Sequence, residues 1–331
     1  MHPILQQDGG VTRDEDLERI AEGYRRFVGD AAEESPRYSE LAAAVAEDDA
    51  ILRFLAGLPA GKWQPPLFLA SVGFTDGVPP DGTALRRRVT QDTDRLRQTM
   101  LSRATQTNEP ARCAALLPPL AAIDGPIGLI EVGTSAGLCL YPDRYSYEYD
   151  GRPVGERRPV HLRCTTSGDV PVPTRLPAVV ARIGVDLDPL DVTDADDRAW
   201  LRALVWPGPR EAERLQRLDA AADEVAADPP VLLRGDLVDE LDAALERVPA
   251  GATPVVMHTA LLPYVPEERR TAFLDRVRQL PVRWIAQEGA GMVPGTGERF
   301  PGGWGPYFVL SVDGRPVAHT APHGGRLDWL P

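Results

Sequence analysis

The sequence predicts an α/β protein: a helical N-terminal part, then a mostly parallel sheet that ends with an antiparallel hairpin. Two patterns predict this class. Before residue 122, apolar residues recur at the spacing of one helix face. From residue 127, short apolar runs alternate with helical segments, and strands that alternate with helices form parallel sheets through crossover connections.

We therefore expect two domains, a helical cap over residues 1–122 and a sheet domain over residues 123–331. Helices of the cap are expected near residues 15–27, 41–55 and 85–101, with Ser39 placed to cap the second. Another is expected to begin at Pro110, because proline suits the first turn of a helix.

The sheet domain is expected to contain strands at residues 129–132, 179–186, 231–236, 254–258, 282–286, 307–312 and 315–320. Helical spacing is found between them, at residues 195–205, 211–226, 238–248 and 267–280. The Asp313-Gly314 dipeptide between the last two strands is typical of a hairpin turn. Residues 145–177, which separate the first two strands, are interpreted as an inserted hairpin.

Composition and charge narrow the classes of partner. The chain has 331 residues and a net charge of −13, which disfavours a polyanionic partner such as a nucleic acid. The N-terminus lacks a secretory pattern, and no apolar run reaches the ~18 residues of a membrane helix. Three widely spaced cysteines without a CxxC pair argue against a zinc knuckle or a disulfide framework. We therefore expect an acidic cytoplasmic protein that acts on a small molecule, without nucleic acid, membrane or bound metal.

The most informative segment runs from residue 128 to residue 140. The apolar strand around Glu131 ends in Gly133, and a helix is expected to open near Gly137. Glycine lets the backbone approach a ligand closely, and a helix N-terminus offers unpaired N–H donors. The pattern predicts a nucleotide-binding loop after the first strand, and a tight turn without a ligand is the alternative.

The order acidic-x-Gly-x-small-x-Gly in this segment is similar to motif I of S-adenosylmethionine (SAM) methyltransferases. Strands that end in Glu131, Asp186 and Asp236, closed by an antiparallel hairpin, resemble the Rossmann-type fold of these enzymes over about residues 123–331. The whole chain also resembles an uncharacterised, mostly actinobacterial family that has a domain-of-unknown-function label and a methyltransferase-like fold. The segments that carry this second resemblance are TQTNE at 105–109, EVGTSAGLCL at 131–140, GVDLDPLD at 184–191 and VVMH at 255–258.

The methyltransferase resemblance implies how SAM would be held. The residues that would border its methionine part are Gly133, Ser135 and Gly137, with Glu131 at the end of the preceding strand. Asp186 would accept hydrogen bonds from the ribose hydroxyls, with Asp188 as the alternative, and Asp236 would accept one from the adenine amino group. The chain departs from the family pattern in having a serine at position 135 and a long insertion before Asp186.

Two side chains at later strand ends are candidates for the chemistry. His258 ends the fourth strand and Glu288 ends the fifth, where ligands bind in open α/β sheets. A neutral imidazole there could take a proton from an oxygen or nitrogen nucleophile. The alternatives are a histidine that hydrogen-bonds a neighbouring loop and a solvated loop carboxylate. Together with His323 they could instead ligate a metal, but their sequence separation gives that idea no support.

Three further residues are candidates for substrate contacts. Asn108 and Glu109 precede the first strand, where a helix often covers the SAM pocket in this fold, and helix capping is the alternative. Tyr145 begins a run of alternating tyrosines that could line an aromatic wall or pack one face of a strand.

The expected function is methyl transfer from SAM to an oxygen or nitrogen of a small molecule. A non-catalytic module that binds SAM or another adenosyl ligand and a metal-assisted reaction on the same fold are the alternatives, because a fold does not fix a function.

Overall fold

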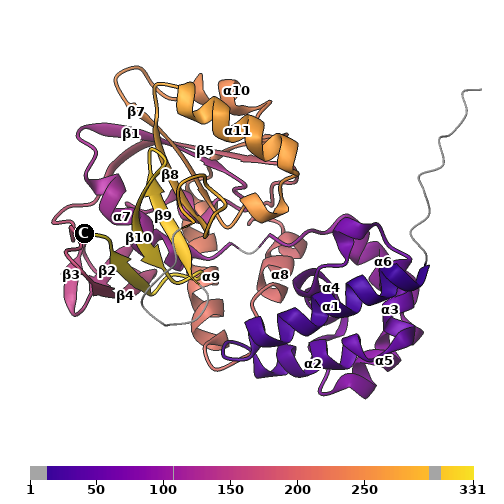
Figure 1. The fold of residues 1–331 in the computed structure, drawn as a ribbon. Coiled ribbons are helices and arrows are strands. Elements are labelled where there is room, and N and C mark those ends of the chain that lie inside the picture. Colours follow the sequence, from indigo (N-terminus) through magenta and orange to yellow (C-terminus); the bar gives the residue numbers. More distant parts are fainter. Residues whose placement is uncertain (1–12, 107, 298–306) are drawn as a thin grey trace, which may run out of the picture. The chain divides into compact units, whose positions relative to one another are not determined.

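The computed structural model describes residues 13–106, 108–297 and 307–331, and the chain divides into two compact units (Figure 1). One unit comprises Met1–Thr107 and Ala199–Glu213, and the other comprises Asn108–Arg198 and Arg214–Pro331. The division expected from the sequence was at residue 122. In the structure, residues 108–122 belong to the unit that contains the sheet, and a short segment from the second half belongs to the helical unit.

The helical unit is built mainly from six α-helices of its N-terminal part. They are α1 (Arg13–Ala31), α2 (Pro36–Ala46), α3 (Asp49–Ala56), α4 (Pro65–Asp76), α5 (Gly82–Gln91) and α6 (Thr93–Ser102). The helix expected over residues 85–101 is therefore two helices, which meet at Asp92. Ser35, and not Ser39, caps α2, because its side chain accepts from the backbone N–H of Tyr38. Ser39 lies inside α2 and donates to the Val28 carbonyl.

Segment 199–213 is joined to this unit by buried contacts. Trp200 is fully buried, donates from its indole nitrogen to the Ala104 carbonyl at 3.2 Å, and meets Phe74 edge to face. Ser35 donates to the Pro207 carbonyl at 2.6 Å. An indole that is buried with its N–H satisfied is a strong local anchor, so this segment folds with the helices.

The second unit contains an eleven-stranded sheet in the order β3-β2-β4-β11-β10-β9-β8-β7-β1-β5-β6. Its strands are β1 (Pro126–Val132), β2 (Ser146–Tyr149), β3 (Arg152–Val154), β4 (His161–Ser167), β5 (Ala178–Asp186), β6 (Val231–Arg234), β7 (Thr253–Thr259), β8 (Arg283–Gly289), β9 (Phe308–Val312), β10 (Arg315–Thr320) and β11 (Arg326–Trp329). Strands β6, β5, β1, β7 and β8 are parallel. The predicted hairpin is confirmed, since β9 pairs antiparallel with both β8 and β10.

The insertion after β1 forms the far edge of the sheet. Its β2–β3 hairpin turns at Asp150-Gly151, and β4 runs parallel to both β2 and β11. The helix that the sequence placed after the glycine loop is only a short 3₁₀ turn, η3 (Leu138–Leu140). The chain therefore passes from β1 to the opposite edge of the sheet before it returns to β5.

Helices cover the parallel strands on both faces. The helices α10 (Leu241–Leu245) and α11 (Glu267–Gln279) pack on one face (Figure 1), over a core that includes Ile130 and Val256. The other face receives η2 (Pro110–Arg112) and α7 (Cys113–Ala121). Because successive strand residues point to opposite faces, Glu131 and Met257, which are register partners, face the α7 side.

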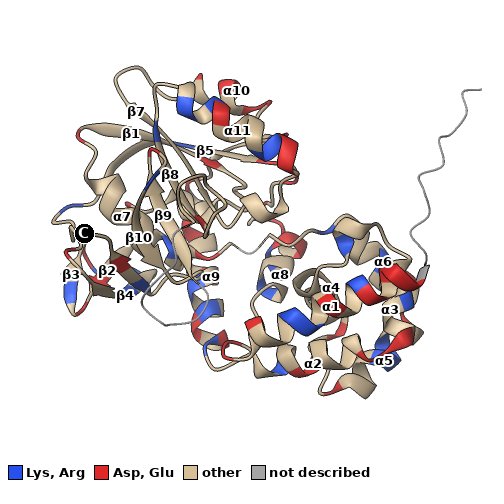
Figure 2. Ribbon diagram, in the orientation of Figure 1, with Lys and Arg blue, Asp and Glu red and all other residues tan. Residues whose placement is uncertain are grey.

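The remaining helices are the 3₁₀ turn η1 (Ala60–Lys62) of the helical unit, α8 (Ala195–Ala203) and α9 (Glu211–Ala227) between β5 and β6, and the 3₁₀ turn η4 (Leu262–Tyr264) after β7. Residues 199–203 of α8 and 211–213 of α9 belong to the helical unit. Acidic and basic residues are interspersed along α1, α9 and α11 (Figure 2). Within the described ranges, no helix is long and apolar enough to cross a membrane.

Candidate functional site

The strand order reverses between β1 and β7. After β1 the parallel strands continue to one side of it as β5 and β6, and the chain then crosses to the other side of β1, where β7 and β8 lie. In open α/β sheets, the crevice beyond the carboxyl ends of the strands at such a switch point binds ligands. Two non-glycine residues here have left-handed backbone, Ser135 after β1 and Ala260 after β7, each with φ 52°. A left-handed alanine costs roughly 1–2 kcal/mol, so the chain maintains strain at this place.

The glycine loop after β1 is held by side chains of the same unit. Gly133 and Gly137 have φ of 71° and 76°, a backbone conformation that favours glycine. The Asn108 amide clasps the loop, since it donates to the Thr134 carbonyl at 2.9 Å and accepts from the Leu138 N–H at 2.8 Å. Asn108 is 9% exposed. Its side chain therefore supports the loop and is not accessible to a substrate.

The loop has few open approaches for a ligand. The Ser135 N–H donates to Asp186 at 2.8 Å, and the Gly133 N–H donates to the Val185 carbonyl at 2.8 Å. A Cβ added at Gly133 would lie 2.5 Å from Leu261 Cδ1. The space beside this glycine is therefore filled by a side chain of the loop after β7.

Three predicted carboxylates lie at the ends of β5 and β6. Asp186 accepts from the N–H groups of Ser135 and Asp188, and Asp188 pairs with Arg234. Asp236 pairs with Arg269; burial acts to raise the pKa of Asp236, but the hydrogen bond and charge of Arg269 hold it below its ordinary value. All three are only partly buried, so their oxygens lie near solvent.

Glu131 is the most perturbed carboxyl group at the switch point. It is 1% exposed and accepts from the Thr134 hydroxyl at 2.9 Å. Burial raises its pKa to about 8, with Asp186 adding to the rise and with Thr134 and Arg112 opposing it. At neutral pH the group therefore retains a proton and can donate a hydrogen bond.

Glu109 lies in a buried ion-pair cluster. It receives Arg217 Nε at 2.8 Å and Arg214 Nε at 3.1 Å, and it caps η2 by accepting from the Ala111 N–H. Burial alone would raise the pKa of Glu109, but the charges of Arg217 and Arg214, helped by His323, lower it to about 2. The sequence offered Thr107 or Asn108 as a helix cap, but in the structure Glu109 itself caps η2; Thr107 lies outside the described residues.

Tyr145 is a packing residue in this structure. It is fully buried and donates to the Leu138 carbonyl at 2.6 Å, which ties the inserted hairpin to η3. Tyr147 and Tyr149 are stacked and donate to the carbonyls of Pro142 and Ala114. The alternation therefore follows the strand-packing alternative.

His258 and Glu288 form a buried pair on the α11 face of the sheet. Trp284 Nε1 donates to His258 Nε2 at 3.1 Å, so the neutral ring carries its proton on Nδ1, which contacts Glu288 at 2.7 Å. Glu288 also accepts from the N–H groups of Leu261 and Leu262. The imidazole is 0% exposed, so the pair fixes the loop after β7, and a role as base would require that loop to open.

The predicted residues therefore fall into separate groups. On the α7 side, the switch point brings together Asn108, Glu131, Ser135 and Asp186. His258 lies one residue beyond Met257, the partner of Glu131, and so points to the other face. Within the described residues, no group of three or more His, Cys, Asp or Glu could hold a metal ion.

Two buried polar residues at this place were not predicted. Arg112, 4% exposed, donates to the Pro322 carbonyl at 3.0 Å and reaches the Thr259 hydroxyl at 3.4 Å. Gln287, 0% exposed, donates to the Thr320 hydroxyl at 2.8 Å. The available signal was a polar residue inside an apolar run, which the segments at 110–120 and 284–288 both contain.

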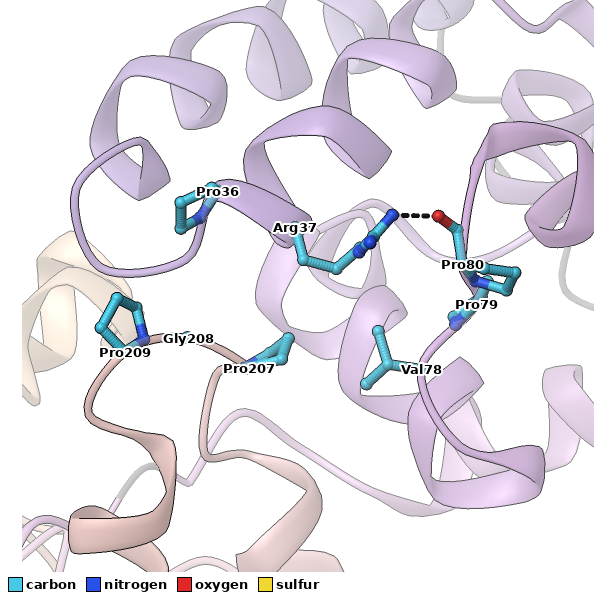
Figure 3. Close-up of a pocket in the computed structure, with 8 residues that line it drawn as sticks. All are labelled: Pro36, Arg37, Val78, Pro79, Pro80, Pro207, Gly208 and Pro209. Atoms are coloured by element: carbon cyan, nitrogen blue, oxygen red, sulfur yellow. Dashed lines mark hydrogen bonds between the residues drawn. The ribbon is translucent and has the colours of Figure 1, made fainter.

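A separate open pocket lies in the helical unit and contains none of the predicted residues (Figure 3). Its lining is Pro36, Arg37, Val78, Pro79, Pro80, Pro207, Gly208 and Pro209. Arg37 donates to the Pro80 carbonyl across it. The lining offers mostly apolar ring surface and one cation.

Comparison with known proteins places the chain in a family. No curated protein and no solved structure matches it. One family model matches residues 80–329, which is most of the chain. The protein therefore belongs to the bacterial family described as "Uncharacterized protein conserved in bacteria (DUF2332)".

Proposed function

We propose that this protein binds SAM at the carboxyl ends of β1, β5 and β6 and transfers its methyl group to an oxygen or nitrogen of a small molecule. The observation that carries the proposal is the gathering of Glu131, Ser135 and Asp186 where the strand order reverses. Ligands of open α/β sheets bind at that point. The order β6-β5-β1-β7-β8 puts the first strand between the second and fourth, as in doubly wound nucleotide-binding sheets.

The carboxylates fit the adenosine half of this ligand. Asp186 ends β5, Asp236 follows the end of β6 by two residues, and both are partly exposed. A carboxylate is acceptor-only, whereas ribose hydroxyls and an adenine amino group are donors. Each such charge-assisted bond contributes roughly 1.5–3 kcal/mol.

The glycine loop fits the methionine half only after one side chain moves. Leu261 occupies the space beside Gly133, and a rotation of this partly buried leucine would open it. When bound, SAM supplies a methyl group on a sulfonium. The task of the chain would be to orient the acceptor and to exclude water, and Glu131, which holds a proton, would act as a hydrogen-bond donor.

A second function is favoured by the same leucine. Leu261 against Gly133, together with an imidazole whose two nitrogens are both engaged, supports a non-catalytic module that binds an adenosyl ligand. Such a module needs the carboxylates but needs no base and no open methyl position.

Calorimetric titration with SAM and S-adenosylhomocysteine tests the binding step. Leu261→Ala removes the side chain that a ligand would displace. Binding then no longer has to break roughly 1.5 kcal/mol of apolar contact, so SAM affinity should rise by about tenfold. The matched control is Leu280→Ala, since both leucines are partly buried and pack on the same core. It should lose similar stability and leave SAM affinity unchanged.

The outcomes separate the candidate functions. No heat and no rise in melting temperature with either ligand at millimolar concentration, in wild type and in Leu261→Ala, would contradict both. Binding with transfer of a labelled methyl group into small molecules of a bacterial extract supports the enzyme. Binding without transfer supports the module.

A further inference from the structure

Gln287 carries a buried acceptor that the structure leaves unused. The residue lies near the carboxyl end of β8 and is 0% exposed. Its Nε2 donates to the Thr320 hydroxyl at 2.8 Å and lies 3.5 Å from the Ala321 carbonyl, and its Oε1 has no partner. A carbonyl can only accept, so the amide nitrogen must face Ala321, and the opposite orientation would place two acceptors against each other.

An unsatisfied buried acceptor is costly, at roughly 1–3 kcal/mol. Native structures have few such atoms, and each calls for a partner such as an ordered water or a ligand. The main-chain oxygen of the same residue accepts from the N–H of Ala260 at 3.0 Å, the alanine with left-handed backbone. The strained residue and the residue with the unpaired acceptor are therefore bonded to each other, and backbone strain is typical of functional sites.

The Gln287 side chain lies on the face of the sheet that carries Glu131 at the switch point. Thr259 is the register partner of Gln287 on β7, and it lies on the face that Glu131 shares. Arg112 reaches the Thr259 hydroxyl from the same side. The Gln287 side chain therefore has the register partner Thr259 on one side and holds the Thr320 hydroxyl with its nitrogen, and the buried Arg112 reaches that same Thr259.

We propose that Gln287 Oε1 accepts a hydrogen bond from the hydroxyl group of an uncharged small molecule, in a subsite between Thr259 and Thr320. An acceptor selects a donor, which excludes carboxylates and phosphates as the group bound at this atom. The nearby guanidinium of Arg112 repels an ammonium group, and an alcohol is a donor that carries no charge. This substrate class rests on the proposed function, because it names the oxygen acceptor of that reaction.

Two isosteric probes test the subsite in crystals of the full chain. Isopropanol has a hydroxyl donor, whereas acetone has the same heavy atoms, a similar size and no donor. We expect isopropanol oxygen within about 3.2 Å of Gln287 Oε1 and no acetone there. A water molecule on Oε1 that persists in the isopropanol soak, or equal occupancy by acetone, overturns the proposal.

Variants extend the test and keep it separate from SAM binding. Gln287→Met should abolish isopropanol binding at this place, and the control Gln279→Met, at the end of α11, should retain it. SAM titration of the same proteins reports on the proposed function alone. Isopropanol binding without SAM binding refutes the cofactor and retains the subsite, and the reverse result refutes the subsite. If Gln287→Met does not fold, the isopropanol and acetone pair on the wild type still decides.

Discussion

Glu131→Gln is expected to remove a pH dependence of folding stability that the buried carboxyl group imposes. Glutamine has nearly the same shape, and its side-chain oxygen can accept from the Thr134 hydroxyl as Glu131 does. Unlike the carboxyl group, it does not titrate. The comparison therefore isolates the proton that the native state holds on Glu131.

The size of the effect follows from the displacement of the pKa. Burial raises the pKa of Glu131 from 4.5 to about 8, so the folded chain binds one more proton than the unfolded chain between these values. The contribution of Glu131 to the free energy of unfolding is therefore complete below about pH 4.5 and is lost as the pH rises toward 8. At 1.36 kcal/mol per unit, the loss between pH 5 and pH 8 is roughly 4 kcal/mol.

Denaturant unfolding of both proteins at several pH values between 5 and 8 measures the difference. The stability of Glu131→Gln relative to wild type should rise by roughly 4 kcal/mol over this range. Glu246→Gln, at the exposed end of α10, should show no such trend. A flat difference for Glu131→Gln would refute the reasoning, because it would mean that Glu131 is ionised in the native state and paired with Arg112.

Two further substitutions test the surroundings of the switch point. Glu109→Gln should lower the free energy of unfolding by roughly 3–5 kcal/mol, because it removes the carboxylate that Arg214 and Arg217 share; denaturant melts measure this, and a loss below 1 kcal/mol would contradict it. The depressed pKa of Glu109, about 2, also predicts that wild-type stability falls as the pH drops from 4.5 toward 2, a slope that Glu109→Gln should lack. Ala260→Gly should relieve backbone strain, raise the free energy of unfolding by about 0.5–1 kcal/mol and so raise the melting temperature. Ala220→Gly within α9 should lower the free energy of unfolding by a similar amount. A lower melting temperature for Ala260→Gly would show that the alanine is not strained.

The parallel core of the sheet could be predicted because local signals determine it. Apolar runs followed by helical spacing mark β1, β5, β6, β7 and β8. The β9–β10 hairpin was marked by Asp313-Gly314, and both residues have positive φ, 52° and 77°, which the predicted kind of turn requires. No local signal showed that a helix would be absent after the glycine loop. It is absent because the chain goes from η3 to a strand at the opposite edge of the sheet, which is a tertiary feature.

The arrangement of the candidate site depends on register, which the sequence does not reveal. His258 and Glu131 end neighbouring strands, so topology alone brings them near each other. Their side chains diverge because Glu131 pairs with Met257, one position before His258, and a shift of one residue moves a side chain to the other face.

The unpredicted residues depend on contacts between distant parts of the chain. Arg112 binds the Pro322 carbonyl, which lies 210 positions later in the sequence. Gln287 is found in a strand whose neighbours Ala286 and Ile285 are core residues, so the pattern indicated only burial. Tertiary partners give both polar groups their roles, and no local pattern encodes them.

The glycine loop shows why its sequence pattern suits two interpretations. A ligand-binding loop and a tight turn both need left-handed glycines, and Gly133 and Gly137 supply them. In this chain Asn108 and Asp186 take loop N–H groups that could otherwise bind a ligand. The loop is thus held by side chains of the chain itself, and under the proposed function specificity would come from side chains around it. A ligand at this edge would be recognised through carboxylates, hydroxyls and the Gln287 amide, and it would owe little to the amides of the loop.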